Sequence, residues 1–337
     1  MLNIEQFLCQ TFSSKQAIKL ARLQTLWSGY GEIARYEVQG LSQPVIVKHI
    51  APPSQSAHPY QWDSDLSHQR KMRSYQVELS WYKNFSGRCQ PDLNLPALLA
   101  AHQNPDNQEM LLVLSDLDAA GFNLRHDSLT LPQLYAAIDW LASFHGQFAH
   151  EVSTDSPYKE LWPIGTYWHL ATRPEELAAM ADSPLKQAAA EIDTRLNLAR
   201  FQTLVHGDAK VANFCFHDAA ETLGIKGIAA LDFQYVGAGI GIKDFIYLLG
   251  SCIDEYELFQ CYRPACEHYF KRLKAQLEQR WSSERVDELI AEWRLLLPFA
   301  WADFERFLAG WQPLHHKRNA FSHQMTERAL DALNGVR

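Results

Sequence analysis

A carboxylate, a carboxamide and a second carboxylate follow one another between residues 206 and 234. Asp208 closes the tripeptide HGD (206–208), Asn213 follows it at the fifth position, and Asp232 opens the tripeptide DFQ (232–234). Phosphoryl transfer from a nucleotide requires a group that orients the attacking hydroxyl and accepts its proton, together with oxygen ligands for Mg²⁺. The pattern therefore predicts Asp208 as the catalytic base and Asn213 and Asp232 as the magnesium ligands.

Each of these residues also has a purely structural interpretation. Asp208 follows a glycine and could form a turn, Asn213 could cap a turn, and Asp232 ends the apolar run GIAAL (227–231). The spacing of all three together favours the chemical interpretation. Lys210 lies between the base and the first metal ligand, where its charge could reach a transferred phosphate or only contact solvent. The sequence leaves these two alternatives for Lys210 open.

The first part of the chain contains the pattern of a sheet. Alternation over 35–38 and the β-branched run VIVKHI (45–50) predict strands, and another strand is expected over 110–117. The polar, proline-containing stretch 51–68 predicts a loop, and 70–85 has the apolar spacing of a helix. This part therefore predicts a mixed sheet with one helix.

From residue 131 onward the pattern is mainly helical. Helices are expected over 131–148, over 183–199 and from Gly241 to the end of the chain, with short strands at 203–206 and 225–233. The sequence thus predicts an α+β fold of two units. A strand-rich lobe would span 1–117, and a larger helical lobe with the catalytic loop and the substrate pocket would span 118–337.

The motif resembles the aminoglycoside phosphotransferase and choline kinase superfamily, which has the bilobal protein-kinase fold. Asp208 and Asn213 have the spacing of the kinase loop H-x-D-x-x-x-x-N, and DFQ stands where protein kinases have DFG. HGD in place of HRD is typical of the small-molecule branch. The phrases HGDAKVANF, VKHI before a proline-rich loop and RKMRSYQVELSWY look like ecdysteroid kinase-like (CHK kinase-like) proteins. The resemblance spans about residues 20–310.

This resemblance implies ATP and Mg²⁺ as cofactors and a small-molecule alcohol, such as a sterol-like or amino-alcohol-like compound, as phosphate acceptor. Lys48 corresponds to the strand lysine that holds the α- and β-phosphates, and Glu78 would orient it through an ion pair. His206, within the catalytic motif, would support the loop rather than act as the base. Asp244 would cap a helix or brace that loop.

The resemblance also suggests how the nucleotide would be held. Gly29 and Gly31 lie in the segment 28–32, which could cover the phosphates with backbone N–H groups or form a plain β-turn. Ser115 and Leu117 flank the position of a hinge that would bind adenine through its backbone.

The acceptor is expected to be small. Eleven residues (233–243) separate Asp232 from the next helix, too few for the segment on which protein kinases bind a peptide. Trp301, Asp303 and Phe304 belong to an aromatic stretch that could hold an amine by cation–π attraction, flank a sterol skeleton, or simply pack in the core. The acceptor, the choice between ATP and GTP, the oligomeric state and the pathway are not predicted.

Composition excludes several other classes of protein. The 337 residues carry 39 acidic and 31 basic side chains, a net charge of −8, without the basic surface of a nucleic-acid binder. Six cysteines without CxxC pairing predict reduced thiols. No apolar run is long enough for a membrane span, and the N-terminus lacks the pattern of a signal peptide. A cytoplasmic protein is expected.

Two other functions are compatible with the motif. A pseudokinase-type nucleotide-binding regulatory protein would share the fold, although such proteins usually lose one of the four polar residues that are intact here (Lys48, Asp208, Asn213 and Asp232). A hydrolase could use Asp208, Asp232 and Asp244 as a metal cluster. A large distance between Lys48 and Asp232 would favour that hydrolase.

Overall fold

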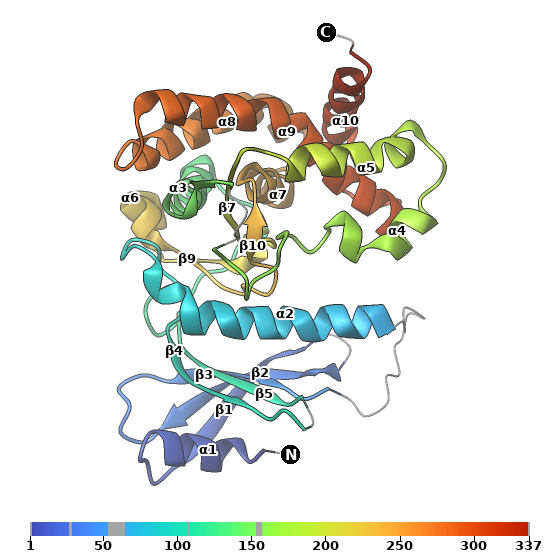
Figure 1. Ribbon diagram of the computed structural model, residues 1–337. Coiled ribbons are helices and arrows are strands. Elements are labelled where there is room, and N and C mark those ends of the chain that lie inside the picture. The colour runs from blue at the N-terminus through green and yellow to red at the C-terminus, as the bar shows by residue number, and fades with distance from the viewer. Residues whose placement is uncertain (1, 27–28, 53–64, 107, 153–156, 336–337) are drawn as a thin grey trace.

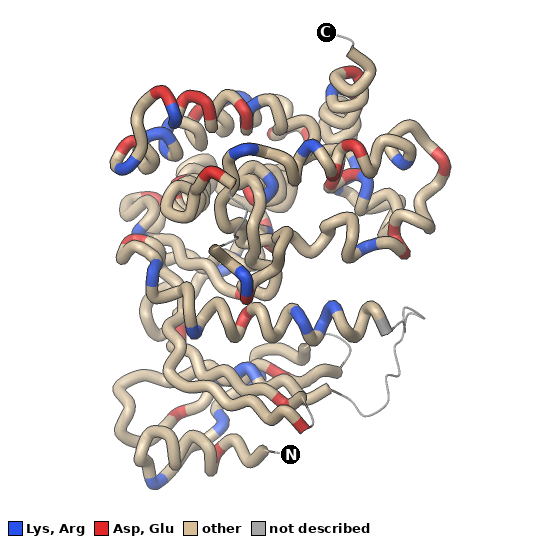
Figure 2. The backbone as a smooth tube through the Cα atoms, viewed as in Figure 1, with Lys and Arg blue, Asp and Glu red and all other residues tan. Residues whose placement is uncertain are grey.

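The computed structural model describes residues 2–26, 29–52, 65–106, 108–152 and 157–335. The chain forms a small lobe built on a sheet and a larger helical lobe, as Figure 1 shows, which confirms the predicted α+β, kinase-like fold. Figure 2 shows that basic and acidic residues are mixed along both lobes. None of the described helices combines the length and the apolar character that a membrane span needs.

The N-terminal lobe contains a five-stranded sheet with the order β1-β2-β3-β5-β4, in which every neighbouring pair is antiparallel. Its elements are α1 (Ile4–Thr11), β1 (Ala17–Thr25), β2 (Gly31–Val38), β3 (Val45–Ile50), α2 (Asp65–Asn84), the 3₁₀ turn η2 (Ser86–Arg88), β4 (Leu98–Gln103) and β5 (Met110–Ser115).

The two faces of this sheet are covered by different helices. Val45 and Val47 of β3 pack in a cluster with Leu8 of α1, whereas Ile50 belongs to the main core together with Tyr75 of α2. Because side chains alternate along a strand, Lys48 points to the same face as Ile50, toward α2. The lysine of VIVKHI is thus directed at the helix that carries the expected glutamate.

The C-terminal lobe is mainly helical. Its helices are α3 (Leu131–Phe148), α4 (Pro174–Ala179), α5 (Pro184–Asn197), α6 (Ala220–Leu223), α7 (Ile242–Cys252), α8 (Glu255–Leu277), α9 (Ser283–Trp311) and α10 (Ala320–Leu333). Its short strands and 3₁₀ turns are β6 (His150–Glu151), η3 (Leu170–Thr172), β7 (Phe201–Val205), η4 (Val211–Asn213), β8 (Phe214–Phe216), η5 (Gly224–Gly227), β9 (Ile228–Ala230) and β10 (Gly237–Gly239).

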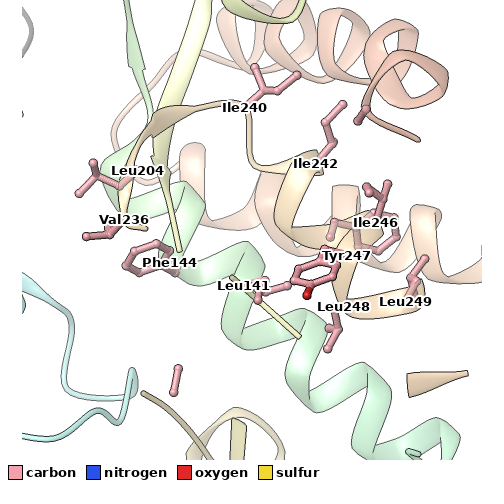
Figure 3. Close-up of a cluster of buried hydrophobic side chains, with 14 of the residues drawn as sticks. Leu141, Phe144, Leu204, Val236, Ile240, Ile242, Ile246, Tyr247, Leu248 and Leu249 are labelled. Atoms are coloured by element: carbon pink, nitrogen blue, oxygen red, sulfur yellow. The ribbon is translucent and has the colours of Figure 1, made fainter. Parts of the chain in front are cut away.

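The core of this lobe adjoins the catalytic motif. Figure 3 shows Leu141 and Phe144 of α3 in one buried cluster with Leu204 of β7 and with residues 246–249 of α7. α3 begins at a capping box in which the Thr130 hydroxyl accepts from the Gln133 N–H. β7 leads from this core into HGD, so the motif extends from a rigid base.

Several predicted elements match the structure and others do not. β3 and α3 have the predicted bounds, whereas the sheet is antiparallel rather than mixed, and α1, β1 and β4 were not predicted. β1 carries no clear alternation because nearly all its side chains are exposed. Residues 65–68 are helical rather than part of the predicted loop, and positions 53–64 of that loop lie outside the described residues. The helical C-terminal region is interrupted at 312–319.

Candidate active site

A cavity of about 490 Å³ lies between the two lobes and contains most of the predicted polar residues. It is lined by Leu23, Gln24, Ile33, Arg35, Ile46 and Lys48 of the sheet, Glu78 and Tyr82 of α2, Pro96, residues 114–118 after β5, and Arg125, Lys210, Ala212, Asn213, Leu231 and Asp232 of the C-terminal lobe. Its walls are thus apolar near β5 and charged toward the catalytic loop.

Lys48 pairs with one carboxylate of its own lobe and with one of the C-terminal lobe. Its Nζ lies 2.7 Å from Glu78 Oε2 and 3.2 Å from Asp232 Oδ1, and both Lys48 and Glu78 are buried. Burial lowers the pKa of Lys48, but the charges of Asp232 and Glu78 outweigh it and raise the pKa above the ordinary value. The lysine therefore stays charged inside the cleft.

Asp232 is held in an unusual backbone conformation. Its φ is +66°, in the left-handed region that non-glycine residues rarely adopt. The next residue, Phe233, is fully buried and stacks on Trp81 of α2 at 4.7 Å, with the His206 ring 4.5 Å away on the catalytic loop. Packing of Phe233 can supply the free energy that keeps Asp232 turned into the cleft.

Gln234 connects Asp232 to α2. Its Oε1 accepts hydrogen bonds from Lys71 Nζ (3.0 Å) and Ser74 Oγ (3.1 Å), while its amide nitrogen donates to Asp232 Oδ1. Burial by itself raises the pKa of Asp232, but Lys48 and Lys71 hold it below the usual range. Asp232 is therefore an ionised carboxylate and a suitable ligand for a hard cation.

Asp208 and Asn213 are hydrogen-bonded to each other. Asn213 Nδ2 donates to the Asp208 carbonyl oxygen (2.7 Å) and to Asp208 Oδ2 (3.0 Å). Within the described chain, Asp208 Oδ1 has no hydrogen-bond partner. Burial raises the pKa of Asp208, and the nearby Lys210 opposes this effect. The carboxylate is thus fixed on one side and free to accept a hydroxyl on the other.

The remaining residues of HGD hold the loop in shape. Asp244, in the first turn of α7, accepts from the backbone N–H groups of His206 (2.5 Å) and Gly207 (3.0 Å). His206 Nε2 lies 2.9 Å from the Leu231 carbonyl oxygen, and Nδ1 accepts from the Asp208 N–H at 3.3 Å. These contacts give His206 and Asp244 positions that brace the loop.

Lys210 lies beside the carboxylate of Asp208. Its Nζ is 3.1 Å from Asp208 Oδ2, its side chain is 38% exposed, and it lines the cavity. Burial lowers the pKa of Lys210, but Asp208 and Asp232 raise it overall. A contact between Lys210 and a transferred phosphate stays a prediction.

The expected hinge lines the same cavity. Ser115 and Leu117 both contribute to its wall, and Ser115 Oγ accepts from the Ala97 N–H at 2.9 Å. Arg35 of β2 clamps this segment, because its Nε donates to Asp116 Oδ2 (2.5 Å) and its Nη2 to Asp118 Oδ2 (2.6 Å). Arg35 belongs to no motif of the sequence and was therefore not predicted.

The two glycines of the β1–β2 turn differ in what requires them. A Cβ on Gly31 (φ +131°) would lie 1.9 Å from the His49 carbonyl oxygen, whereas a Cβ on Gly29 (φ +74°) would meet nothing within 4 Å. Neither glycine lines the cavity, and Ser28 lies outside the described residues. The close approach of β3 explains Gly31, and a phosphate-covering role for the turn stays a prediction.

The predicted substrate residues Trp301, Asp303 and Phe304 lie in the core of the lobe, and a contact with the acceptor stays a prediction. Trp301, Asp303 and Phe304 are only 2%, 0% and 3% exposed, and none of them lines the cavity. The Asp303 carboxylate is neutralised inside the lobe, with Arg306 Nη2 at 2.8 Å and Lys243 Nζ at 3.7 Å. The amphipathic pattern of α9 reflects core packing, which the sequence could not separate from a ligand wall.

Several residues near the site were not predicted. Lys71, Tyr167, Tyr247 and Lys317 come from α2, from the segment before η3, from α7 and from the connection between α9 and α10. The Tyr167 and Tyr247 hydroxyls are 3.1 Å apart, and Lys317 Nζ lies 4.6 Å from the centroid of the Tyr247 ring. Only Lys71 had a signal in the sequence, because it precedes Glu78 by two helical turns on α2.

The oxygen donors fit one hard cation rather than a metal cluster. Asn213 and Asp232 line the same cavity, and a carboxamide with a carboxylate suits Mg²⁺ completed by phosphates and water. No set of three His, Cys, Asp or Glu side chains that could hold a metal occurs in the described residues. Asp244 is bound to backbone amides, and Lys48 is 3.2 Å from Asp232. The hydrolase with a three-aspartate cluster is therefore not supported.

A family model matches part of the chain. Residues 164–280 match the ecdysteroid kinase-like family. The matched segment includes HGD, DFQ and α7, and the predicted resemblance is confirmed. No curated protein sequence matches the chain.

A solved structure with a TM-score of 0.50 supports the fold, and two others are also similar to the chain. The GDP complex of wild-type aminoglycoside 2'-phosphotransferase-IIIa is 12% identical with a TM-score of 0.50, and the match covers 98% of this chain and 97% of that chain. A microcompartment-associated aminopropanol kinase is 13% identical with a TM-score of 0.48, covering 98% of both chains. An amicoumacin kinase in complex with AMP-PNP and Ca²⁺ is 15% identical with a TM-score of 0.47, covering 98% and 94%. At these identities the likeness concerns the fold.

Proposed function

We propose that the protein is an ATP-dependent kinase that transfers the γ-phosphate to a hydroxyl of a small molecule. The observation that carries this proposal is the meeting of Lys48 with Glu78 at 2.7 Å and with Asp232 at 3.2 Å in one interlobe cavity. Asn213 and Lys210 line the same cavity, and Asp208 is bonded to both. A hydrolase or a simple binding protein has no need for this combination.

Each residue has a role that follows from its surroundings. Asp208 orients the acceptor hydroxyl through its free Oδ1 and takes the proton as the new bond to phosphorus forms. Lys48 pairs with nucleotide phosphates, and Glu78 fixes its position. Asn213 and Asp232 would hold Mg²⁺, which when bound neutralises charge on the phosphates. The apolar wall near Leu114 and Ile46 suits a purine base.

The length of the segment after DFQ supports a small acceptor. Residues 237–239 form β10, which pairs with β7, and α7 begins at Ile242. This segment is thus bound into the lobe and offers no platform for a peptide. One structural relative is an aminoglycoside phosphotransferase, which is consistent with a small hydroxylated acceptor.

Two aspartate variants test the proposal. Asp208→Asn should retain Mg-nucleotide binding while kcat falls about 10²–10⁴-fold, because only the proton acceptor is removed. Asp232→Ala should abolish turnover and weaken Mg-dependent nucleotide binding. Phosphorylated products from a mixture of alcohols, detected by mass spectrometry, and nucleotide titration by calorimetry measure the two effects.

The matched control is Asp218→Asn, because Asp218 is 80% exposed and lies outside the cavity. It should behave as the unsubstituted protein in both assays. Nucleotide binding without any phosphorylated product would instead indicate the pseudokinase alternative. Unimpaired turnover by Asp232→Ala would refute the assignment of the site.

A further inference from the structure

Several aromatic and basic side chains from separate segments lie near Asp208, the carboxylate of the catalytic loop. Tyr167 and Tyr247 are joined through their hydroxyls at 3.1 Å, and the Tyr235 ring lies 5.9 Å from the Tyr167 ring. Burial raises the pKa of Tyr167, and the charge of Asp208 raises it further. The tyrosines therefore lie within electrostatic reach of the proposed base.

Lys317 is a cation that lies beside this group of tyrosines. It lies between α9 and α10, and its Nζ is 4.6 Å from the Tyr247 ring centroid and 6.0 Å from that of Phe304. In the described part of the chain, no carboxylate is within ion-pair distance of it. Burial lowers the pKa of Lys317 to about 8, and Asp208 opposes this shift. A half-buried ammonium without a counter-ion is unfavourable unless an anion reaches it.

Arginines lie on the other side of the tyrosines. Arg173 is stacked 5.7 Å from the Tyr167 ring, and Arg70 of α2 donates to the Thr172 carbonyl oxygen at 2.7 Å. Burial lowers the pKa of Arg70, and the charge of Arg173 lowers it further, so two cations lie close together. Arg70 forms no ion pair with any carboxylate of the described residues.

Three carboxylates of the surrounding segments are paired with arginines. Glu176 pairs with Arg173 at 3.0 Å, Asp303 pairs with Arg306 inside the lobe, and Glu305 pairs with Arg318 at 2.8 Å. Lys317 has no such partner among the described residues, so a positively charged group beside it would meet an uncompensated like charge. An acceptor that carries a negative group would pair with this lysine.

We propose that the acceptor is an alcohol that also carries an anionic group, a carboxylate or a phosphate or sulfate ester, bound by Lys317 beside Tyr247. This inference rests on the proposed kinase function and adds the chemical class of the acceptor. The tyrosine rings would cover the carbon skeleton, Lys317 would pair with the anion, and the hydroxyl would lie at Asp208. The hydroxyl oxygen forms the bond to the γ-phosphorus, its proton goes to Asp208, and ADP leaves.

Matched alcohols test this inference. We would measure kcat/KM with the unsubstituted protein and with Lys317→Gln for four related alcohols: glycerol, glycerate, glycerol 3-phosphate and 3-amino-1,2-propanediol. Larger homologous sets would be measured in the same way. Anionic members should exceed their neutral partners by at least about 10-fold, and Lys317→Gln should remove most of this preference. The KM for Mg-ATP is measured in parallel, so that weaker nucleotide binding is distinguished from a lost preference for anionic acceptors. Carboxylate and phosphate members separate the two kinds of anion.

Lys271→Gln is the matched control, because Lys271 is exposed on α8 and forms no ion pair with the described residues. It should keep the preference for anionic alcohols. Thermal-shift titration of each alcohol in the presence of AMP-PNP gives a second measurement that does not depend on turnover. Anionic alcohols should stabilise the unsubstituted protein and not Lys317→Gln.

Three results would overturn the inference. These are a preference for the neutral or amine-bearing members, an unchanged preference in Lys317→Gln, and equal lack of binding by all members. In each case, Mg-ATP binding together with Asp232-dependent phosphate transfer to another alcohol would show that the proposed kinase function still stands. If Mg-ATP does not bind and no alcohol is phosphorylated, the kinase proposal itself has failed.

Discussion

The two carboxylates of the site are driven in opposite directions by their neighbours. Burial dominates for Asp208 and raises its pKa, whereas Lys48 and Lys71 hold the pKa of Asp232 below its usual range. A pair of groups whose pKa values are pushed apart is the arrangement expected for one proton acceptor and one ion that stays charged. The proposed division of work between base and metal ligand therefore has an electrostatic origin.

This difference predicts the pH dependence of the reaction. Asp208 accepts a proton only as a carboxylate, so kcat/KM should rise with pH through a pKa above 3.8 and then level off. Asp232 titrates below that range and should not contribute. Initial rates from about pH 4.5 to pH 8, with circular dichroism to confirm folding, measure the profile.

The control for this profile is again Asp218→Asn, which should leave the acid limb unchanged. A rate that is already level at the lowest pH where the protein stays folded would contradict the raised pKa of Asp208.

At the residue scale, the sequence predicted the site residues that lie close together along the chain. Asp208, Asn213 and Asp232 follow one another along the chain, and the structure brings them together with Lys48 and Glu78, although their roles stay predictions. Lys317 could not be found in this way, because its place beside Tyr247 depends on how α9 and α10 pack. The approach of Lys243 to Asp303 could not be found either, because these two residues are distant in sequence.

At the scale of elements, the β1–β2 hairpin shows which glycine is required by the fold. β2 and β3 pair in register with Gly31 opposite Ile50, and this pairing brings the His49 carbonyl oxygen against Gly31. β1 itself was missed because its exposed side chains lack the alternation of a half-buried strand. β3 was predicted with correct bounds because both of its faces are buried.

Alanine substitutions should separate these two glycines. Gly31→Ala should reduce the free energy of unfolding by roughly 3 kcal/mol, because the methyl group clashes with backbone that the sheet cannot move. Gly29→Ala should reduce it by only about 1–2 kcal/mol, since its positive φ is strained but the space is open. Urea denaturation of both variants measures the difference. Equal effects would show that β3 can move away from a methyl group at position 31.

At the scale of the whole molecule, α2 and a few polar contacts connect the lobes. Arg73 donates to the Leu161 carbonyl oxygen at 3.1 Å, Lys71 reaches Gln234, and Lys48 reaches Asp232. The cavity lies at this junction, so a nucleotide would contact both lobes at once. Opening of the lobes and binding of nucleotide are therefore expected to be linked.

This linkage predicts that Mg-ATP stabilises the folded protein. A ligand that binds only the native state at about 100 times its Kd adds about 2.7 kcal/mol, which should raise Tm by a few degrees. Asp232→Asn should lose the magnesium-dependent part of the shift, whereas Asp208→Asn should keep it, because Asp232 is a proposed ligand of the cation and Asp208 is not. Differential scanning fluorimetry with ATP, with and without Mg²⁺, measures each shift against the same variant without ligand. Equal magnesium-dependent shifts in the two variants would mean that the cation binds elsewhere.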